Sequence, residues 1–235
     1  MKRPKFRARG YGVVAAIIAV CAAWSASAAP LSFKLDPTRS VFAIVTHKAG
    51  LAAAFAHSHL VSATRYEASL SADPVDLTLS RFEFQTRVQD LDIDDPNIVA
   101  RVRPALIAMA IKDDYPKLSM SNRDTTRKNM WSPQQLDAEQ FPLISANVIK
   151  IEAVQTRIGE VVFDYILDMQ ITLHGRSVTR RIPAHISINE HQLAAEALGA
   201  LRFSDFNIEP FRSVGGLIRV EDRFHLYVKL AAQRQ

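Results

Sequence analysis

The sequence predicts an all-β fold, an antiparallel up-and-down β-barrel of about eight strands with one or two short helices. From Pro30 onward, apolar and polar residues alternate with period two, which is the pattern of strands with one buried and one solvated face. Short turns such as His174-Gly175 favour antiparallel pairing. Several apolar strand faces are long enough for a closed barrel whose interior can hold a ligand. A β-sandwich, or an interior filled by its own side chains, would give the same periodicity.

The first 28 residues have the three parts of a secretory signal peptide. Five basic side chains stand within the first nine residues, an apolar run covers residues 13–24, and Ala26-Ser27-Ala28 supplies the small residues of a cleavage site. The apolar run is shorter than the roughly 20 residues that a membrane-spanning helix needs. We therefore expect cleavage after Ala28, no stable membrane anchor after that cleavage, and a barrel domain over residues 29–235. The single cysteine, Cys21, lies within the signal, so the mature chain is expected to have no disulfide.

The net charge of +5 comes entirely from this leader. Without residues 1–28 the chain has 29 − 5 = 24 basic and 24 acidic side chains. A neutral domain lacks the basic footprint of a protein that binds a phosphate backbone, so nucleic acid is not an expected partner.

Five alternating segments are expected as strands, and they follow one another along the chain. The apolar positions that mark them are Val41, Ala43 and Val45; Phe82 and Phe84, with Leu77 and Leu79 before them; Tyr165, Leu167, Met169, Ile171 and Leu173; Ile182, Ala184, Ile186 and Ile188; and Phe224, Leu226, Val228 and Leu230. The face from Tyr165 to Leu173 is the longest. We therefore expect its five residues to line the barrel interior and to form the ligand-binding site.

Two segments depart from the alternation and are expected as helices. The stretch from Asn97 to Lys112 is apolar and is interrupted by Pro104. Ser132-Pro133-Gln134-Gln135 has the pattern of a capped helix start, and Phe141-Pro142 would end that helix. The polar segment from Asn122 to Met130 is expected as a turn.

The segment Phe55-Ala56-His57-Ser58-His59 is the local feature best suited to chemistry. Residues two apart on a strand face the same way, about 6.5 Å apart, so His57 and His59 could both reach one divalent transition metal ion. His47, Glu67 and His174 are the candidates for a third ligand. The alternative is a pair of exposed histidines without a function.

Other polar groups give weaker signals. Arg176, Arg180 and Arg181 flank the Gly175 turn and could hold an anionic head group, or they could be a solvated hairpin tip. Four aspartates between residues 90 and 95 lack the glycine and glutamate of a calcium loop, so they are interpreted as a polar strand end. The sequence has no nucleophile elbow, zinc-protease motif or phosphate-binding glycine loop, and no enzymatic activity is expected.

Four motifs in order resemble the YceI-like lipid/polyisoprenoid-binding family. They are LDPTRS at residues 35–40, LDAEQFP at residues 136–142, ITLHG at residues 171–175 followed by VT at 178–179, and FSDFNI at residues 203–208. The resemblance extends from about Leu31 to Leu230. It implies a lipocalin-like barrel in the periplasm with an elongated apolar cavity for a polyisoprenoid or another long-chain amphiphile. The chain departs from the family pattern at Pro96-Asn97 and at Asn207, where the family often has glycine.

The sequence and this resemblance together predict an exported, periplasmic carrier or scavenger of a lipid. The alternative is a metal- or haem-associated periplasmic redox accessory protein that uses His57 and His59. A hydrolase would need a nucleophile paired with one of these histidines, and no motif supplies one. The ligand's chain length and head group, and the oligomeric state, are left open.

Overall fold

In the computed structural model, residues 29–55 and 57–235 are described, so the expected signal peptide lies outside the described residues. The predicted fold class is confirmed, because the strands form a closed antiparallel barrel of eight strands accompanied by two helices. The strands are β1 (Leu31–Leu35), β2 (Val41–Ala49), β3 (His59–Ala63), β4 (Glu67–Ala72), β5 (Arg81–Arg87), β6 (Leu91–Ile93), β7 (Leu143–Ile158), β8 (Val161–Leu173), β9 (Arg176–Ile188), β10 (Gln192–Arg202), β11 (Arg212–Ser213) and β12 (Ile218–Arg234), and the helices are α1 (Pro96–Ala108) and α2 (Met120–Trp131).

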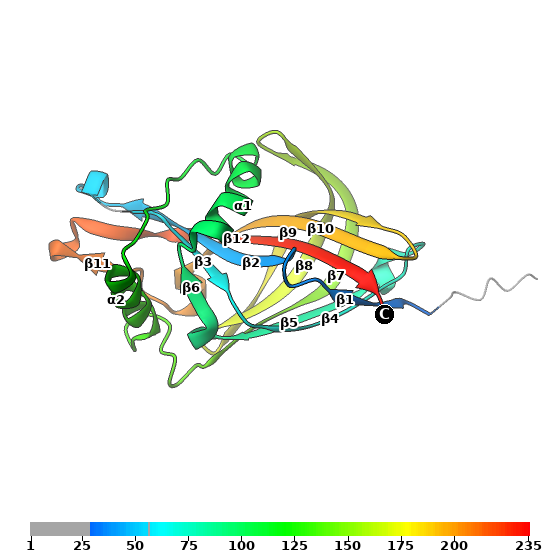
Figure 1. The fold of residues 1–235 in the computed structure, drawn as a ribbon, viewed down its shortest axis with the longest axis horizontal. Coiled ribbons are helices and arrows are strands. Elements are labelled where there is room, and N and C mark those ends of the chain that lie inside the picture. The colour runs from blue at the N-terminus through cyan, green and yellow to red at the C-terminus, as the bar shows by residue number, and fades with distance from the viewer. Residues whose placement is uncertain (1–28, 56) are drawn as a thin grey trace, which may run out of the picture.

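The barrel closes through the pairing of its first and last strands. The order of neighbours is β1-β4-β5-β7-β8-β9-β10-β12, and β12 pairs with β1 to complete the ring (Figure 1). β12 pairs with two strands along one edge: its C-terminal end pairs with β1, and its N-terminal part pairs with β2. β3 and β6 continue the sheet beyond β2. The barrel therefore extends at one end into a short additional wall.

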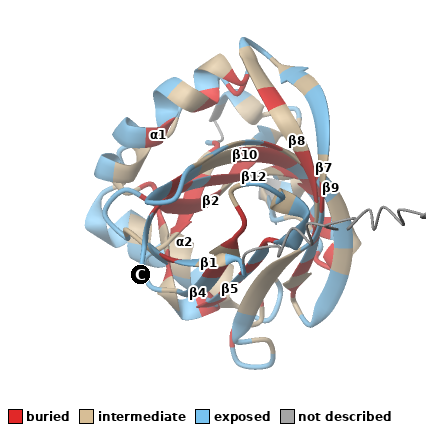
Figure 2. Cartoon of the chain, turned by 90° about the vertical axis from the view of Figure 1, so that its right-hand side faces the viewer, coloured by how far each residue is buried: buried red, intermediate tan, exposed pale blue. Residues whose placement is uncertain are grey.

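The wall formed by β2, β10 and β12 is buried on both faces. Its inner face belongs to the main core of the barrel, whereas its outer face carries a second core with α1, in which Val102 and Leu106 are fully buried. Figure 2 looks along the barrel and shows α1 outside this wall. This arrangement explains why β2 is buried at nearly every position from Val41 to Thr46 instead of at alternate ones.

The five expected strands are all present, although Leu77 and Leu79, expected to lead into the second, form a 3-10 turn before β5. The turn at His174-Gly175 connects β8 to β9. Both turn residues have positive φ, 52° and 69°, as in the two-residue turns that suit the twist of a hairpin. A Cβ atom at Gly175 would lie 2.6 Å from the Phe141 ring, so this position requires glycine. Asn207 has φ 59°, a left-handed conformation that asparagine tolerates better than most residues, which explains how it can replace a glycine.

The first expected helix is present as α1, which includes Pro104. The second was placed wrongly. The segment expected as a turn forms most of α2, whereas Ser132 ends that helix instead of starting one, because its backbone N–H bonds to the Asn129 carbonyl. No residue of α2 is fully buried, so the helix has no apolar periodicity that a sequence pattern could detect.

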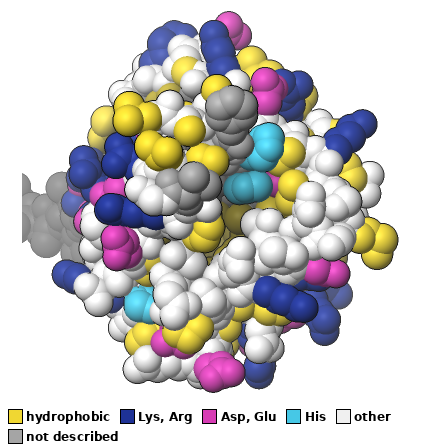
Figure 3. All heavy atoms as spheres, turned by 90° about the vertical axis from the view of Figure 1, so that its left-hand side faces the viewer, with side chains coloured by type: hydrophobic (Ala, Val, Ile, Leu, Met, Phe, Trp, Pro, Cys, Tyr) yellow, Lys and Arg dark blue, Asp and Glu magenta, His cyan; other side chains and the backbone are white. Residues whose placement is uncertain are grey.

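Polar contacts attach α2 to the barrel. Arg123 and Arg127 lie within ion-pair distance of Asp92, and the Trp131 indole donates a hydrogen bond to the Val88 carbonyl oxygen at 3.0 Å. Figure 1 shows α2 and β11 at the same end of the barrel, and Figure 3 views the molecule from this side. Neither described helix is long and apolar enough to span a bilayer.

Candidate ligand-binding cavity

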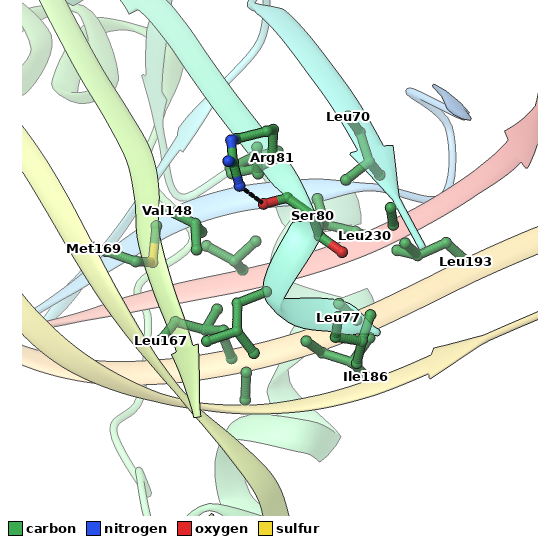
Figure 4. Close-up of a pocket in the computed structure, with 17 residues that line it drawn as sticks. Leu70, Leu77, Ser80, Arg81, Val148, Leu167, Met169, Ile186, Leu193 and Leu230 are labelled. Atoms are coloured by element: carbon green, nitrogen blue, oxygen red, sulfur yellow. Dashed lines mark hydrogen bonds between the residues drawn. The ribbon is translucent and has the colours of Figure 1, made fainter. Parts of the chain in front are cut away.

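The barrel interior contains two adjoining compartments with apolar walls. Their empty volumes are about 650 and 840 Å³, including space open to solvent. Phe82, Met169 and Val228 line both compartments, so the two adjoin in the middle of the barrel. Of the residues that line the first, only Ser80 and Arg81 are polar, and in the second only Thr86 and Ser145. Figure 4 shows the first compartment, with aliphatic side chains from several strands around it.

Four of the five residues expected to bind the ligand line these compartments. Leu167 and Met169 face the first compartment, and Met169, Ile171 and Leu173 face the second. Tyr165 is half-buried and packs against the main core, but it lines neither compartment. The face of β8 from Leu167 to Leu173 thus points into the barrel.

Small residues on β9 and β10 help to leave this space open, and the sequence analysis did not single out those on β10. Ala184, Ala195 and Ala197 line the first compartment. Gly199 follows on the same face of β10, where a Cβ atom would lie 2.1 Å from Ile182 Cδ1. The signal that could have identified this wall is the period-two series from Leu193 to Leu201, in which the three central inward positions, 195, 197 and 199, are small.

A third compartment, which we call the mouth compartment, lies at the end of the barrel where α2 stands. It has an empty volume of about 910 Å³, including open solvent, and it shares Ile44, Val61, Leu136 and Phe203 with the second inner compartment. It is more polar than the inner compartments: Thr46, His59, Thr126, Asn129 and Gln135 are among the residues that line it. Figure 3 shows histidine side chains beside a hollow at this end. The three compartments therefore form a series that runs from a polar mouth to an apolar interior.

His59 lines the mouth compartment and is held by a buried carboxylate. Its Nδ1 atom lies 2.7 Å from Oδ2 of Asp94, whose side chain is 0% exposed. The other oxygen, Oδ1, accepts a hydrogen bond from the Leu60 backbone N–H at 2.8 Å. From the sequence, Asp94 was expected only as part of a polar strand end. Asp94 and His59 are 35 positions apart in the sequence, which left no local signal of their pairing.

The metal pair expected at His57 and His59 stays a prediction. His57 is exposed and lies two residues before β3, while His59 has Nδ1 engaged by Asp94. Among residues 29–55 and 57–235, no group of three or more His, Cys, Asp or Glu side chains is arranged to hold a metal ion.

The three candidates for a third ligand make other contacts or lie elsewhere. His47 lies on the outer face of β2, whereas His59 lines the mouth compartment. Glu67 is exposed at the start of β4, and the His174 ring packs against Phe141.

A second histidine cluster lies on the outer face of the barrel, beside the segment that follows α1. His47 Nδ1 is 2.9 Å from Asp113 Oδ2, and His47 Nε2 is 2.7 Å from His225 Nδ1. Asp113 also accepts a hydrogen bond from the Ser58 hydroxyl at 2.5 Å. The hydrogen bond from His47 holds the pKa of Asp113 below its ordinary value, while burial, with the nearby His47 and Arg223, lowers the pKa of His225 to about 4. This cluster connects β2, β12 and the segment after α1.

The arginines near the Gly175 turn do not converge on a common site. Arg180 pairs with Asp205 at 2.6 Å, and the exposed Arg181 pairs with Glu152 at 2.6 Å. Arg176 is exposed at the start of β9. Because two of the three charges already have carboxylate partners, the geometry favours the interpretation as an ordinary hairpin over a site for an anionic head group.

An eight-stranded antiparallel barrel with an apolar interior and a more polar mouth defines the class of lipocalin-like barrels. Residues 33–232 match the model of the YceI-like domain, so the chain belongs to the YceI-like family. No curated protein matches the sequence.

One solved structure shares the fold at low sequence identity, and two others are similar over most of this chain. BcnA from Burkholderia cenocepacia is 13% identical with a TM-score of 0.57, over 84% of this chain and 99% of that one. A YceI protein from Campylobacter jejuni is 12% identical with a TM-score of 0.49, over 74% of this chain and 84% of that one. A polyisoprenoid-binding domain from Saccharophagus degradans, implicated in plant cell wall breakdown, is 8% identical with a TM-score of 0.49, over 87% of this chain and 99% of that one.

Proposed function

We propose that this protein is a carrier or scavenger that holds a long-chain apolar ligand, such as a polyisoprenoid, inside the barrel. The observation that carries the proposal is the pair of adjoining inner compartments, whose walls are almost entirely apolar. Membership of the YceI-like family supports it.

The binding energy of such a ligand comes from the transfer of its tail out of water. Each buried methylene group contributes about 0.8 kcal/mol, or roughly 25 cal/mol for each Å² of apolar surface. The few polar side chains of the inner walls stand just before β5, at its two ends, and near the start of β7. A tail along the face of β8 therefore meets mainly aliphatic and aromatic groups. This environment selects for length and shape of the tail more than for specific polar groups.

The proposed role is binding without catalysis, in the periplasm. Among the described residues that line the two inner compartments, there is no histidine, cysteine or carboxylate that could serve as nucleophile or general base. Export rests on the sequence of residues 1–28, which has the parts of a cleaved signal peptide.

The direct test is to purify the protein from its native compartment and to analyse an organic-solvent extract by mass spectrometry. We expect a long-chain lipid at near-stoichiometric amount. Metal analysis of the same sample addresses the redox alternative, and a stoichiometric metal without any lipid would overturn the carrier proposal.

A matched pair of variants on β8 tests the position of the ligand. Met169→Arg places a charge between the two compartments, so we expect loss of lipid retention and a decrease in stability of several kcal/mol. Gln170→Arg is the control, because Gln170 is the exposed neighbour on the opposite face of the strand. If both variants retain lipid as the wild type does, the ligand does not lie along β8.

A further inference from the structure

The mouth compartment contains a polar pair that the binding of an apolar tail does not require. His59 begins β3, and its side chain lies on the same strand face as Val61, which lines both the mouth and the second inner compartment. The His59 side chain is 21% exposed, so the ring is accessible from the compartment. His59 therefore stands where a ligand in the inner compartments would emerge.

Asp94 fixes the hydrogen-bonding character of this histidine. The Asp94 carboxylate is buried and already accepts a bond from the Leu60 N–H, so it accepts a second bond from Nδ1–H of His59. In a neutral imidazole the proton on Nδ1 leaves a lone pair on Nε2. No described residue forms a hydrogen bond with Nε2 of His59, so this atom offers a free acceptor at the mouth.

The remaining walls of the mouth compartment determine which head group fits. Its polar residues are neutral hydroxyls and carboxamides, namely Thr46, Thr126, Asn129 and Gln135, and neither lysine nor arginine is among the described residues that line it. The nearest carboxylate to the ring is the buried Asp94, which would repel a phosphate or a carboxylate. An uncharged group that donates a hydrogen bond suits this site better than an anion.

We infer that His59 and Asp94 form a head-group subsite for an uncharged, hydroxyl-bearing amphiphile, in which the ligand hydroxyl donates to Nε2 of His59 and the tail extends into the inner compartments. Asp94 is a positioning residue that sets the tautomer of His59. The inference rests on the proposed function, since it presumes that the inner compartments hold the tail.

Binding of three matched ligands to the wild-type protein tests the inference without any substitution. The probes are geranylgeraniol, its methyl ether and its phosphate monoester, all titrated at the same pH. One hydrogen bond contributes about 1 kcal/mol, so we expect the alcohol to bind about fivefold more tightly than the ether. The phosphate should bind no more tightly than the ether.

Two variants then separate the roles of the residues. In His59→Ala the acceptor is lost, so the alcohol should weaken to the affinity of the ether, which itself should not change. In Asp94→Asn the carboxamide oxygen accepts the hydrogen bond from the Leu60 N–H, so the carboxamide NH₂ faces Nδ1 of His59. Nδ1 must then accept a hydrogen bond, and the ring proton of His59 moves to Nε2. Nε2–H can donate a hydrogen bond to the ether oxygen, so the ether should bind more tightly than it binds the wild type. The protein should then no longer prefer the alcohol to the ether.

The chain offers a matched control in a second histidine–aspartate pair. His185 Nδ1 lies 2.5 Å from Asp164 Oδ2, and both side chains are largely exposed and line none of the three compartments. His185→Ala should leave all three affinities unchanged.

The outcomes distinguish this inference from the proposed function. If the wild-type protein binds none of the three probes, the proposed function fails. If it binds the alcohol and the ether equally, the carrier proposal stands and the head-group subsite is wrong. If the phosphate binds more tightly than the alcohol and His59→Ala weakens it, the site takes an anion and the inferred class of ligand is wrong.

Discussion

Leu60 and Val61 are consecutive residues of β3, and they belong to two separate hydrophobic cores. Leu60 is fully buried in the outer core with Val102 and Leu106 of α1, whereas Val61 is 6% exposed and lines the cavity. The alternation of side chains along a strand places the two on opposite faces of the same wall. Along β3, one residue therefore packs against α1 and the next lines the cavity.

This division predicts different effects of two substitutions. Leu60→Ala removes packing against α1 without changing the cavity wall, so the free energy of unfolding should decrease by about 2–5 kcal/mol while lipid affinity stays the same. Val61→Phe adds bulk between the second inner compartment and the mouth, so lipid affinity should decrease with a smaller change in stability. Urea denaturation and lipid titration of both variants measure the two effects. A large loss of lipid affinity in a folded Leu60→Ala protein would contradict the separation of the two cores.

The sequence allowed prediction of those strands that have one polar face toward solvent and one apolar face toward the barrel interior. β8 shows this best, since the residues from Leu167 to Leu173 alternate clearly and do face the cavity. β2 gave a weaker pattern because α1 buries its outer face, so both sets of residues are apolar. α2 left no clear pattern, because ion pairs to Asp92 hold it together with a few apolar contacts from Met130 and Trp131 at its C-terminal end.

The mouth of the cavity could be predicted only in part. The histidine motif drew attention to His59, and the aspartate-rich segment to Asp94, but the two sites were interpreted separately. Their contact arises from the antiparallel pairing of β3 with β6, a non-local relationship that the spacing of residues does not encode. The same reason explains why the outer cluster of His47, Asp113 and His225 was missed, since it joins three distant segments.

Cleavage of the leader after Ala28 is a prediction of the sequence. Ala26 and Ala28 occupy the small-residue positions that a signal peptidase requires. N-terminal sequencing of the exported protein should therefore begin at Ala29. Replacement of both alanines by leucine should block the cleavage and retain the protein at the membrane. An intact leader on exported wild-type protein would refute the predicted signal peptide.

Metal binding by His57 and His59 is a further prediction. The contact of His59 Nδ1 with Asp94 resembles the arrangement in which a carboxylate orients a metal-bound histidine, and it leaves Nε2 available. Calorimetric titration with zinc should give near-stoichiometric heats, which the double change His57→Ala and His59→Ala should remove. Equal heats from both proteins would show that this pair binds no metal, and the carrier proposal would be unaffected.

The outer histidine cluster predicts a loss of stability in mild acid. The pKa of His225 is about 4, below its ordinary value of 6.5, because burial disfavours the charged ring. Between these two values the unfolded chain binds a proton at this residue that the folded chain does not bind. Stability should therefore be fully present above about pH 6.5 and should decrease as the pH falls toward 4. The lowered pKa of Asp113 acts in the same direction, but in the lower range where carboxyl groups titrate.

The variant His225→Gln tests this effect because it removes the titrating ring and keeps a side-chain donor for Nε2 of His47. Its free energy of unfolding, measured with urea at a series of pH values from about 7.5 to 4.5, should decline less steeply than that of the wild type. His185→Gln serves as a control for the loss of a histidine on the outside of the barrel, away from this cluster. The slope of this free energy against pH reports the difference in bound protons between the unfolded and folded states. Equal slopes for His225→Gln and the wild type would mean that His225 takes up its proton equally in both states. The cluster would then have no role in acid stability.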